Sequence, residues 1–215
     1  MGVSGFQISE NKGNRIVRQE MHLDLMRDTA TVFPEREHKD EIRSLRIWHC
    51  KYKSLQAVTG FQNLEELEIA SFPDKSLEIL APLQKLRYLS ILHMPKVSDL
   101  EALSMLINIE SLSLSTSPAW DSAGKCTIVD SLKPVVSMSA LKHLELFGVC
   151  SADRSLAVLE QCKSLQSARF SQYPKDEVAR FYRVTGVANQ FNPKPSFHND
   201  KSNGLDLIKK IMETG

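Results

Sequence analysis

LEELEIASFPDKSLEILAPLQKLRYLSILHM, residues 64–94, contains the pattern that decides the fold of this chain. Its first apolar pair, Leu67 and Ile69, returns 22 residues later as Leu89 and Ile91. Successive pairs begin 22, 22, 22, 23, 32 and 24 residues apart, and the full ladder is Leu23/Leu25, Leu45/Ile47, Leu67/Ile69, Leu89/Ile91, Leu112/Leu114, Leu144/Leu146 and Ala168/Phe170. A repeat of nearly constant length predicts a solenoid, which offers an extended functional surface instead of a pocket.

Each repeat unit reads as a short strand followed by a tight helical return. Apolar residues occupy positions 1, 4 and 6, counting Ile42 as position 1, and positions 4 and 6 alternate with polar residues as in a half-buried strand. A second apolar set recurs every three residues, a spacing that suits 3₁₀ or helical turns: Leu55, Val58, Phe61; Leu77, Leu80, Leu83; Leu100, Leu103, Leu106. Neither piece can bury its apolar side alone, so we expect stacked units to share one core.

The segments LEELEI, LRYLSI, IESLSL and LKHLEL resemble the L-x-x-L-x-L core of leucine-rich repeats, and SDLEALSMLINIESLSL is similar to the short, internalin-like class with 22-residue units. The resemblance covers roughly residues 20–185. It implies an α/β fold, a leucine-rich-repeat solenoid with a curved parallel sheet on the concave side and short helical or 3₁₀ turns on the convex side. For the family it also implies protein recognition, and seldom catalysis.

The turn after each strand departs from the family pattern. The family places Asn or Cys at position 9, where the side chain bonds the turn backbone, whereas this chain has Cys50, Phe72, Met94, Ser117, Val149 and Tyr173. Phe72, Met94 and Val149 cannot accept such bonds, so the turn backbone needs other partners. We therefore expect irregular turn geometry. Internalins are also exported, and because this chain shows no export signal, host-cell adhesion is not implied.

The repeats divide the chain into three parts. Residues 1–19 form an N-terminal segment, residues 20–185 form the repeat domain, and residues 186–215 form a proline-containing loop followed by a short amphipathic helix, GLDLIKKIM. The domain contains about seven units, of which the first, MHLDLM, is degenerate and shields the end of the core, and the long step places an insertion near 117–131. Residues 176–184, DEVARFYRV, read as a helix. The final helix is interpreted as a cap on the last repeat, with a partner-binding helix as the alternative.

Composition and the N-terminal sequence predict a cytoplasmic protein. Lys plus Arg total 27 against 26 Asp plus Glu, a balance that gives no pull toward nucleic acid or an anionic membrane. No apolar run approaches the roughly 20 residues that span a bilayer, and the N-terminus lacks the apolar region of a signal peptide. Phe6 stands where N-myristoylation requires Ser or Thr. In such a chain Cys50, Cys126, Cys150 and Cys162, which show no paired spacing, are expected to be reduced thiols.

No motif for catalysis, metal binding or a cofactor emerges from the sequence. The chain has no H-E-x-x-H, Walker or G-x-S-x-G motif. His49 and His93 occupy the same position in units that lie two strands apart. Two strand spacings separate them by about 10 Å, which is too far for a shared metal ion. Cys50 beside His49 is interpreted as an inward structural thiol, because adjacent strand residues point to opposite faces. We expect no enzyme, no cofactor and no metal site.

The outward positions 3, 5 and 7 of each unit form the candidate site. Seven strands give a surface roughly 30 Å wide, enough for a standard protein interface. Large apolar and charged groups there, with one tryptophan of the insertion, are the candidate partner-binding residues: Arg46, Trp48, Glu68, Tyr88, Leu92, His143, Glu145, Phe147, Arg169 and Trp120. Three alternatives stay open: the opposite charges are cross-strand pairs only, residues 1–18 cover Trp48, or Trp120 folds back over the core edge.

The sequence therefore predicts a protein–protein interaction module that binds another protein through its concave sheet. An inhibitor or immunity protein that occludes an enzyme or toxin is one alternative, and a structural adaptor or assembly subunit is the other. A nucleic-acid reader would show a stripe of Lys and Arg along one face, which this chain lacks, and no membrane partner is expected. The oligomeric state is left open, with a monomer favoured.

Overall fold

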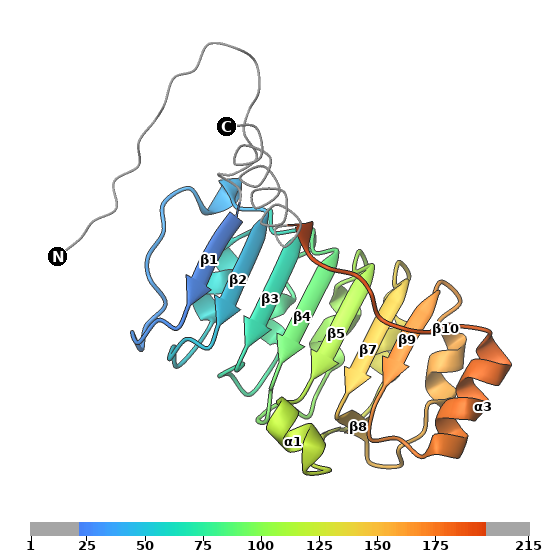
Figure 1. Cartoon of the computed structure of the whole chain (residues 1–215). Coiled ribbons are helices and arrows are strands. Elements are labelled where there is room, and N and C mark those ends of the chain that lie inside the picture. Colours follow the sequence, from blue (N-terminus) through green and yellow to red (C-terminus); the bar gives the residue numbers. More distant parts are fainter. Residues whose placement is uncertain (1–21, 197–215) are drawn as a thin grey trace, which may run out of the picture.

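The computed structural model describes residues 22–196, which form one curved parallel sheet backed by helical turns (Figure 1). The sheet has eight strands in the order β1-β2-β3-β4-β5-β7-β9-β10. Their bounds are β1 His22–Met26, β2 Ser44–Trp48, β3 Glu66–Ala70, β4 Tyr88–Leu92, β5 Ser111–Ser115, β7 His143–Phe147, β9 Ser167–Phe170 and β10 Ala188–Asn189. A separate two-stranded sheet pairs β6 (Thr127–Val129) with β8 (Val149–Ser151).

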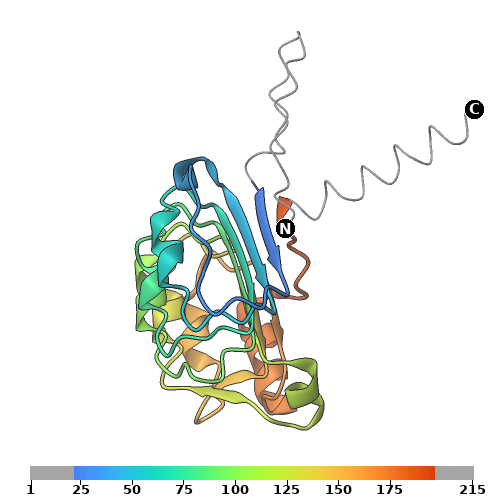
Figure 2. The ribbon, with the colours of Figure 1, turned by 90° about the vertical axis from the view of Figure 1, so that its left-hand side faces the viewer.

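Short helices return the chain behind the sheet, all on the face opposite the solvent-facing strand residues (Figure 2). They are η2 Lys39–Glu41, η3 Gln56–Gly60, η4 Glu78–Leu80, η5 Glu101–Met105, α2 Lys133–Val136 and η6 Ala157–Gln161. The three-residue apolar spacing explains this arrangement, because residues i and i+3 of a 3₁₀ turn lie on one side. Leu77, Leu80 and Leu83 are fully buried in this way.

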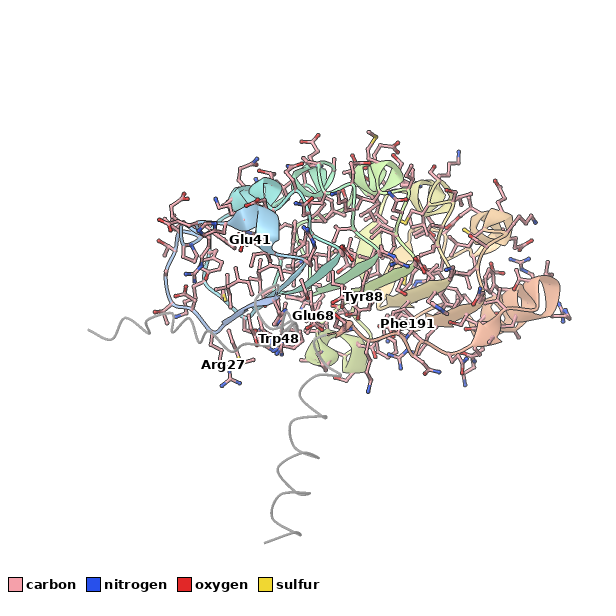
Figure 3. The ribbon with its side chains drawn as sticks, turned by 90° about the horizontal axis from the view of Figure 1, so that it is seen from above. Arg27, Glu41, Trp48, Glu68, Tyr88 and Phe191 are labelled. Carbon is pink, nitrogen blue, oxygen red and sulfur yellow. The ribbon has the colours of Figure 1, made fainter. Side chains whose placement is uncertain are left out.

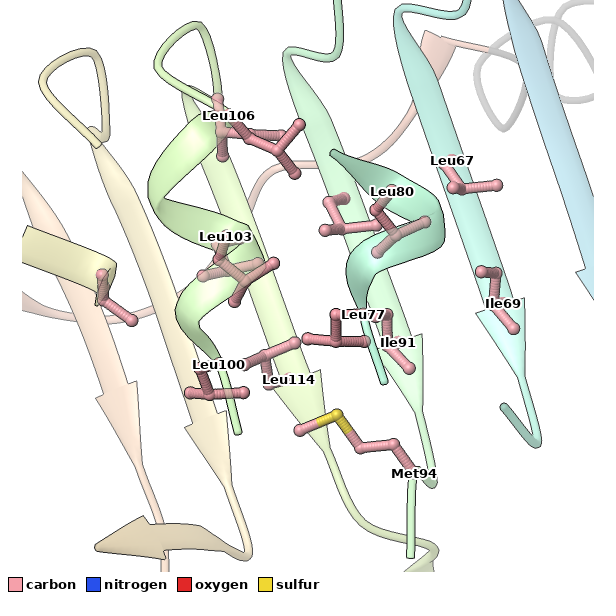
Figure 4. Packing of buried hydrophobic residues seen from close by; sticks show 14 of the residues in the cluster. Leu67, Ile69, Leu77, Leu80, Ile91, Met94, Leu100, Leu103, Leu106 and Leu114 are labelled. Atoms are coloured by element: carbon pink, nitrogen blue, oxygen red, sulfur yellow. The ribbon is translucent and has the colours of Figure 1, made fainter. Parts of the chain in front are cut away.

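The register predicted from the ladder is confirmed across the sheet. Leu67 pairs with Leu45 on one side and with Leu89 on the other, and Leu89 pairs with Leu112. Ladder residues from Leu25 to Ala168 are buried, whereas the two end members are half-buried. Figure 4 shows this core, with strand and turn leucines of successive repeats filling one continuous layer. The chain has the leucine-rich-repeat solenoid fold.

The turns after the strands are regular, so the prediction of irregular turn geometry is wrong. Position 8 adopts the left-handed conformation in most units, for example His49 (φ 53°), Ser71 (φ 70°) and His93 (φ 67°). Its N–H donates to the position-7 carbonyl of the next repeat, as from Ser71 to Leu92 at 2.7 Å. The sheet hydrogen bonding thus continues one residue past the strand, and this satisfies the backbone without asparagine.

Most position 9 side chains fill the core in place of binding the turn backbone; the exception is Ser117, whose hydroxyl accepts a hydrogen bond from the Trp120 N–H at 3.4 Å. Phe72, Met94 and Val149 are buried, at 2%, 0% and 0% exposure. Two of the three polar members reach across to the adjacent unit: Cys50 Sγ donates to the Leu25 carbonyl at 3.3 Å, and Tyr173 Oη donates to the Val149 carbonyl at 3.0 Å. The apolar residues at this position stabilise the stack by packing.

The C-terminal end of the core is closed by α3 (Lys175–Thr185), which confirms the helix predicted over 176–184. Phe181 is fully buried and its ring lies edge-on to Phe170, with centroids 5.2 Å apart. Gly186 ends the helix with φ 69°, a left-handed conformation that glycine adopts without strain. The chain then forms β10 beside β9, an eighth strand that the seven-rung ladder did not predict.

Two segments predicted from the sequence fall outside residues 22–196. The N-terminal segment 1–19 and the amphipathic helix in 204–212 lie outside the described residues. Within the described range, no helix combines the length and the hydropathy needed to cross a bilayer.

Acid is expected to weaken the packing of α3 on the last repeat, because Glu177 of α3 becomes protonated. Hydrogen bonds from Arg180, at 2.7 and 2.8 Å, and from the Leu156 N–H lower the pKa of Glu177 from 4.5 to about 2. Because the folded pKa lies below the unfolded value, this stabilisation is complete above about pH 4.5 and is lost as the pH falls toward 2. The free energy of unfolding, measured in urea across this range, should fall less steeply in Glu177→Gln. The exposed control Glu35→Gln should keep the wild-type slope; equal slopes for all three proteins would contradict the assignment.

Candidate functional site

Positions 3, 5 and 7 of the strands face away from the helical turns and form the concave face, as the strand alternation predicts. In Figure 3, seen from above, the helices lie on one side of the sheet, and Trp48 lies toward the other. Trp48, Tyr88, Leu92 and Phe147 are half-buried, so each large side chain keeps part of its surface in solvent. The concave face therefore brings together nine of the ten predicted binding residues, with Trp120 supplied by the insertion.

One end of the concave face carries an arginine held between two carboxylates. Arg46 on β2 forms ion pairs with Glu68 on β3, at 3.2 Å, and with Asp24 on β1, at 3.6 Å. Its guanidinium lies 4.6 Å from the centre of the Trp48 ring, a cation–π contact. The carboxylates and the guanidinium together fix the position of an aromatic side chain that keeps an exposed surface.

The opposite end of the face repeats this chemistry. Arg169 on β9 donates from Nε to Glu145 on β7 at 2.5 Å, and its guanidinium lies 5.1 Å from the centre of the Phe147 ring. Ser113 on β5 donates to the second Glu145 oxygen at 2.7 Å. Glu145 is only 7% exposed. It therefore orients Arg169 and Phe147, and little of its own surface is available to a partner.

Between the two ends, β4 presents Tyr88 and Leu92. Burial, helped by the negative charge of Glu68, raises the pKa of Tyr88 well above its ordinary value. The phenol is therefore protonated at neutral pH and can donate a hydrogen bond. The neighbouring serines of β4 and β5 are small, so Tyr88 and Leu92 are the large side chains at the middle of the face.

Two histidines at position 3 pair with serines on the next strand. His22 Nδ1 lies 3.1 Å from Ser44 Oγ, and His143 Nδ1 lies 2.8 Å from Ser167 Oγ. Burial lowers the pKa of His143, with the charge of Lys142 acting in the same direction. His143 is thus a neutral polar group of the concave face at pH 7.

The insertion forms a short helix at the carboxyl ends of the strands. It begins with α1 (Pro118–Ser122), and Figure 2 shows α1 projecting toward the concave side of the sheet. The Trp120 ring lies edge-on to His93 at 5.0 Å, and Asp121 accepts hydrogen bonds from Ser171 and Gln172 beyond β9. Trp120 is half-buried at the rim, where it packs on the turn after β4 and keeps part of its surface exposed.

One component of the face has no signal in the sequence. Residues 190–196, here named the strap, run from β10 across the concave face toward β3 (Figure 1). Ser196 donates from its backbone N–H to both oxygens of Glu66, at 2.9 and 3.1 Å, and from its hydroxyl at 2.9 Å. Pro193 and Pro195 favour an extended chain. No periodic pattern, however, connects residues 130 positions apart.

The described residues contain no group of three metal-binding side chains. Burial raises the pKa of Cys150 to about 12 and that of Cys162 to about 11, so both thiols are protonated at neutral pH. Thiolates are the nucleophilic form of cysteine. Cys150 and Cys162 therefore have the surroundings of structural thiols and not of nucleophiles.

Comparisons with known proteins identify similar solved structures. No protein-family model matches the sequence, and no curated protein is significantly similar to it. Internalin C2 of Listeria monocytogenes is 20% identical, with 61% of this chain and 53% of that chain covered and a TM-score of 0.45. The internalin inlF of the same species is 15% identical, with 78% and 54% covered and a TM-score of 0.48. A leucine-rich-repeat protein of Leptospira interrogans is 19% identical, with 78% and 48% covered and a TM-score of 0.42. The chain spans about half the length of these proteins.

Proposed function

We propose that the protein is a binding module that recognises another protein through the concave face, with no catalytic role. The observation that carries this proposal is the arginine–aromatic–carboxylate cluster at each end of the face, Arg46–Trp48–Glu68 and Arg169–Phe147–Glu145. Tryptophan, tyrosine and arginine are the side chains that most often anchor protein interfaces. Here the carboxylates hold the arginines against the rings before any partner arrives.

This pre-organisation reduces the cost of association. A free arginine or tryptophan loses rotamer freedom when it is fixed in an interface, and each immobilised side chain costs about 0.5–1.5 kcal/mol. Trp48 on β2 and Phe147 on β7 are four strand spacings apart, about 19 Å. Two fixed anchors at this separation, with Tyr88 and Leu92 between them, suit a folded protein surface of ordinary interface size.

The charges of the face favour a protein over nucleic acid. Asp24, Arg46 and Glu68 alternate in sign at one end, and Glu145 and Arg169 do so at the other. A surface that binds phosphate chains needs unpaired cations in a row, and both arginines here are already paired. Complementary mixed charge instead selects a protein partner and fixes its orientation.

The biological consequence depends on which part of the partner is covered. A partner whose active site faces Trp48 and Phe147 would be inhibited, as an immunity protein inhibits a toxin. A partner bound through the convex turns would make this protein an adaptor. We further propose the cytoplasm as its compartment, because Cys50, Cys126, Cys150 and Cys162 are all free thiols.

Replacing the two ring anchors, Trp48 and Phe147, should weaken partner binding. In Trp48→Ala/Phe147→Ala the two cation–π contacts and the anchor surfaces disappear, and each loss should cost about 1 kcal/mol or more, so the dissociation constant should rise at least about fivefold per ring. The measurement is affinity capture from native extract, followed by titration of the captured partner by calorimetry. A shifted melting temperature would identify a variant that loses binding through misfolding.

The matched control is Met105→Ala/Ile107→Ala, at the end of the convex helix η5 and in the turn that follows it, where the side chains are 56% and 51% exposed. This variant removes a similar apolar surface from the opposite side of the solenoid and should bind the partner like the wild type. Loss of binding by the convex variant, with retention by the concave one, would exclude the concave face and favour the adaptor.

A further inference from the structure

The strap occupies one edge of the concave face, and among residues 22–196 it leaves Trp48 and Phe147 at the other edge uncovered. It crosses the strands on the side of position 3, where Glu66, Tyr88 and Ser111 are neighbours in the register. Pro193 and Lys194 of the strap line a pocket of about 200 Å³ together with these three residues. Ser196 ends the strap on Glu66.

The strap is held at its two ends, and the chain between these ends makes few polar contacts. At one end β10 pairs with β9, where the Ala188 N–H donates to the Gln166 carbonyl at 3.0 Å. At the other end Ser196 donates to Glu66. Pro193 and Pro195 have no N–H, and among residues 22–196 no hydrogen bond joins residues 191–195 to the sheet. Pro195 is buried nevertheless, so shape and apolar contact hold this part.

Glu66 differs from the other carboxylates of the face in its partner. Glu68 and Glu145 each pair with an arginine, whereas within the described part of the chain the Glu66 oxygens accept hydrogen bonds only from Ser196. Its strand neighbours across the sheet are Ser44 and Tyr88, which carry no positive charge. Without the strap, a half-buried carboxylate would lose its N–H and hydroxyl donors, which stabilise charged acceptors strongly.

The pocket beside the strap is lined by three carboxylates, of which Glu66 has no cationic partner among the described residues. Glu65 pairs with Arg43, and Glu110 pairs with Arg87 and Lys142. Lys194 is the only charged residue of the strap. The edge therefore accepts an extended segment that brings a cation, a proline beside Tyr88, and N–H and hydroxyl donors for Glu66.

We propose that this edge is a binding site for extended, proline-containing, cationic peptide segments, and that the strap is its intramolecular occupant, which such a segment of a partner must displace. The inference rests on the proposed function, since it adds a peptide subsite to the face that carries the ring anchors. A tethered segment is present at an effective concentration of about millimolar, so it excludes weak competitors. Its prolines keep it extended at little entropic cost.

The test uses the full chain and a fluorescent peptide of the strap sequence, QFNPKPS. Ser196→Pro removes both the N–H and the hydroxyl that bond Glu66, so it should release the strap. If the strap occupies the edge about nine-tenths of the time, the apparent dissociation constant of the peptide for the wild type is raised about tenfold. Fluorescence anisotropy should therefore show about tenfold tighter peptide binding by Ser196→Pro, and binding should be lost in Ser196→Pro/Glu66→Gln.

Two controls distinguish specific binding at this site from non-specific peptide binding. Asn192→Ala changes an exposed strap residue and should bind the peptide like the wild type, and the peptide QFNPKPP, which lacks the donors, should bind neither protein. Equal affinity of wild type and Ser196→Pro, or no binding by Ser196→Pro, would overturn the inference. The Trp48→Ala/Phe147→Ala variant should behave as the wild type in this assay, so a failure of the ring anchors to bind a partner is observed separately.

Discussion

Leu89→Ala is expected to lower the free energy of unfolding by about 2–5 kcal/mol. Leu89 lies at the centre of the ladder on β4, fully buried, with Leu67 and Leu112 beside it in the register. Truncation removes buried apolar surface and leaves a cavity that the rigid neighbouring rungs cannot fill. Urea unfolding followed by circular dichroism measures the loss directly, and the curve should remain cooperative because each repeat contacts its neighbours.

Met105→Ala provides the comparison for Leu89→Ala, since Met105 is 56% exposed on η5. Its replacement should change the free energy of unfolding by no more than about 0.5 kcal/mol. If Leu89→Ala were as mild as Met105→Ala, the ladder residues would not form the core, and the assignment of positions 3, 5 and 7 to the concave face would fail with it.

The second large effect is expected at Gly148, in the turn between β7 and β8. Gly148 has φ 67°, and a Cβ atom there would lie 2.2 Å from Thr116 Cγ2 and 3.3 Å from Thr116 Cβ. Thr116 is only 2% exposed and β-branched, so it cannot move aside. Gly148→Ala should destabilise the protein by about 3 kcal/mol or more, combining the left-handed backbone cost with overpacking.

Gly124→Ala separates these two causes. Gly124 has φ 68°, nearly the same as Gly148, but nothing lies within 4 Å of its added Cβ. It should therefore show the backbone cost alone, about 1–2 kcal/mol. Thermal or urea unfolding of both variants gives the comparison. Equal losses would mean that the contact with Thr116 contributes nothing to the requirement for glycine.

The sequence predicts the core of this fold in detail because the constraint is periodic. Each ladder pair alternates with polar residues, so a shift of one residue would expose every leucine and isoleucine of a strand. Register and burial were therefore predictable together. The turns were not, because the prediction required a side chain to satisfy them. In the structure the left-handed residue at position 8, such as Ser71, extends the sheet hydrogen bonding.

The concave face was predictable in part. Strand alternation places Arg46, Trp48 and Glu68 side by side, and their charges and sizes suggest their contacts. The burial of Glu145 was not predictable, because it depends on Ser113 and Arg169 from two other repeats. The position of the strap could not be predicted for the same reason. Its hydrogen bond to Glu66 joins residues 130 positions apart, with no motif at either end.

Hydroxyl-radical footprinting of the wild-type protein, alone and with its captured partner, tests most directly whether the concave face is the binding surface. Trp48, Tyr88 and Phe147 report on the concave face, and Met105 reports on the convex side. We predict that the partner lowers the oxidation of the three concave aromatic residues and leaves that of Met105 unchanged. Protection of Met105, with unchanged oxidation of Trp48 and Phe147, would show that the concave face is not the binding surface.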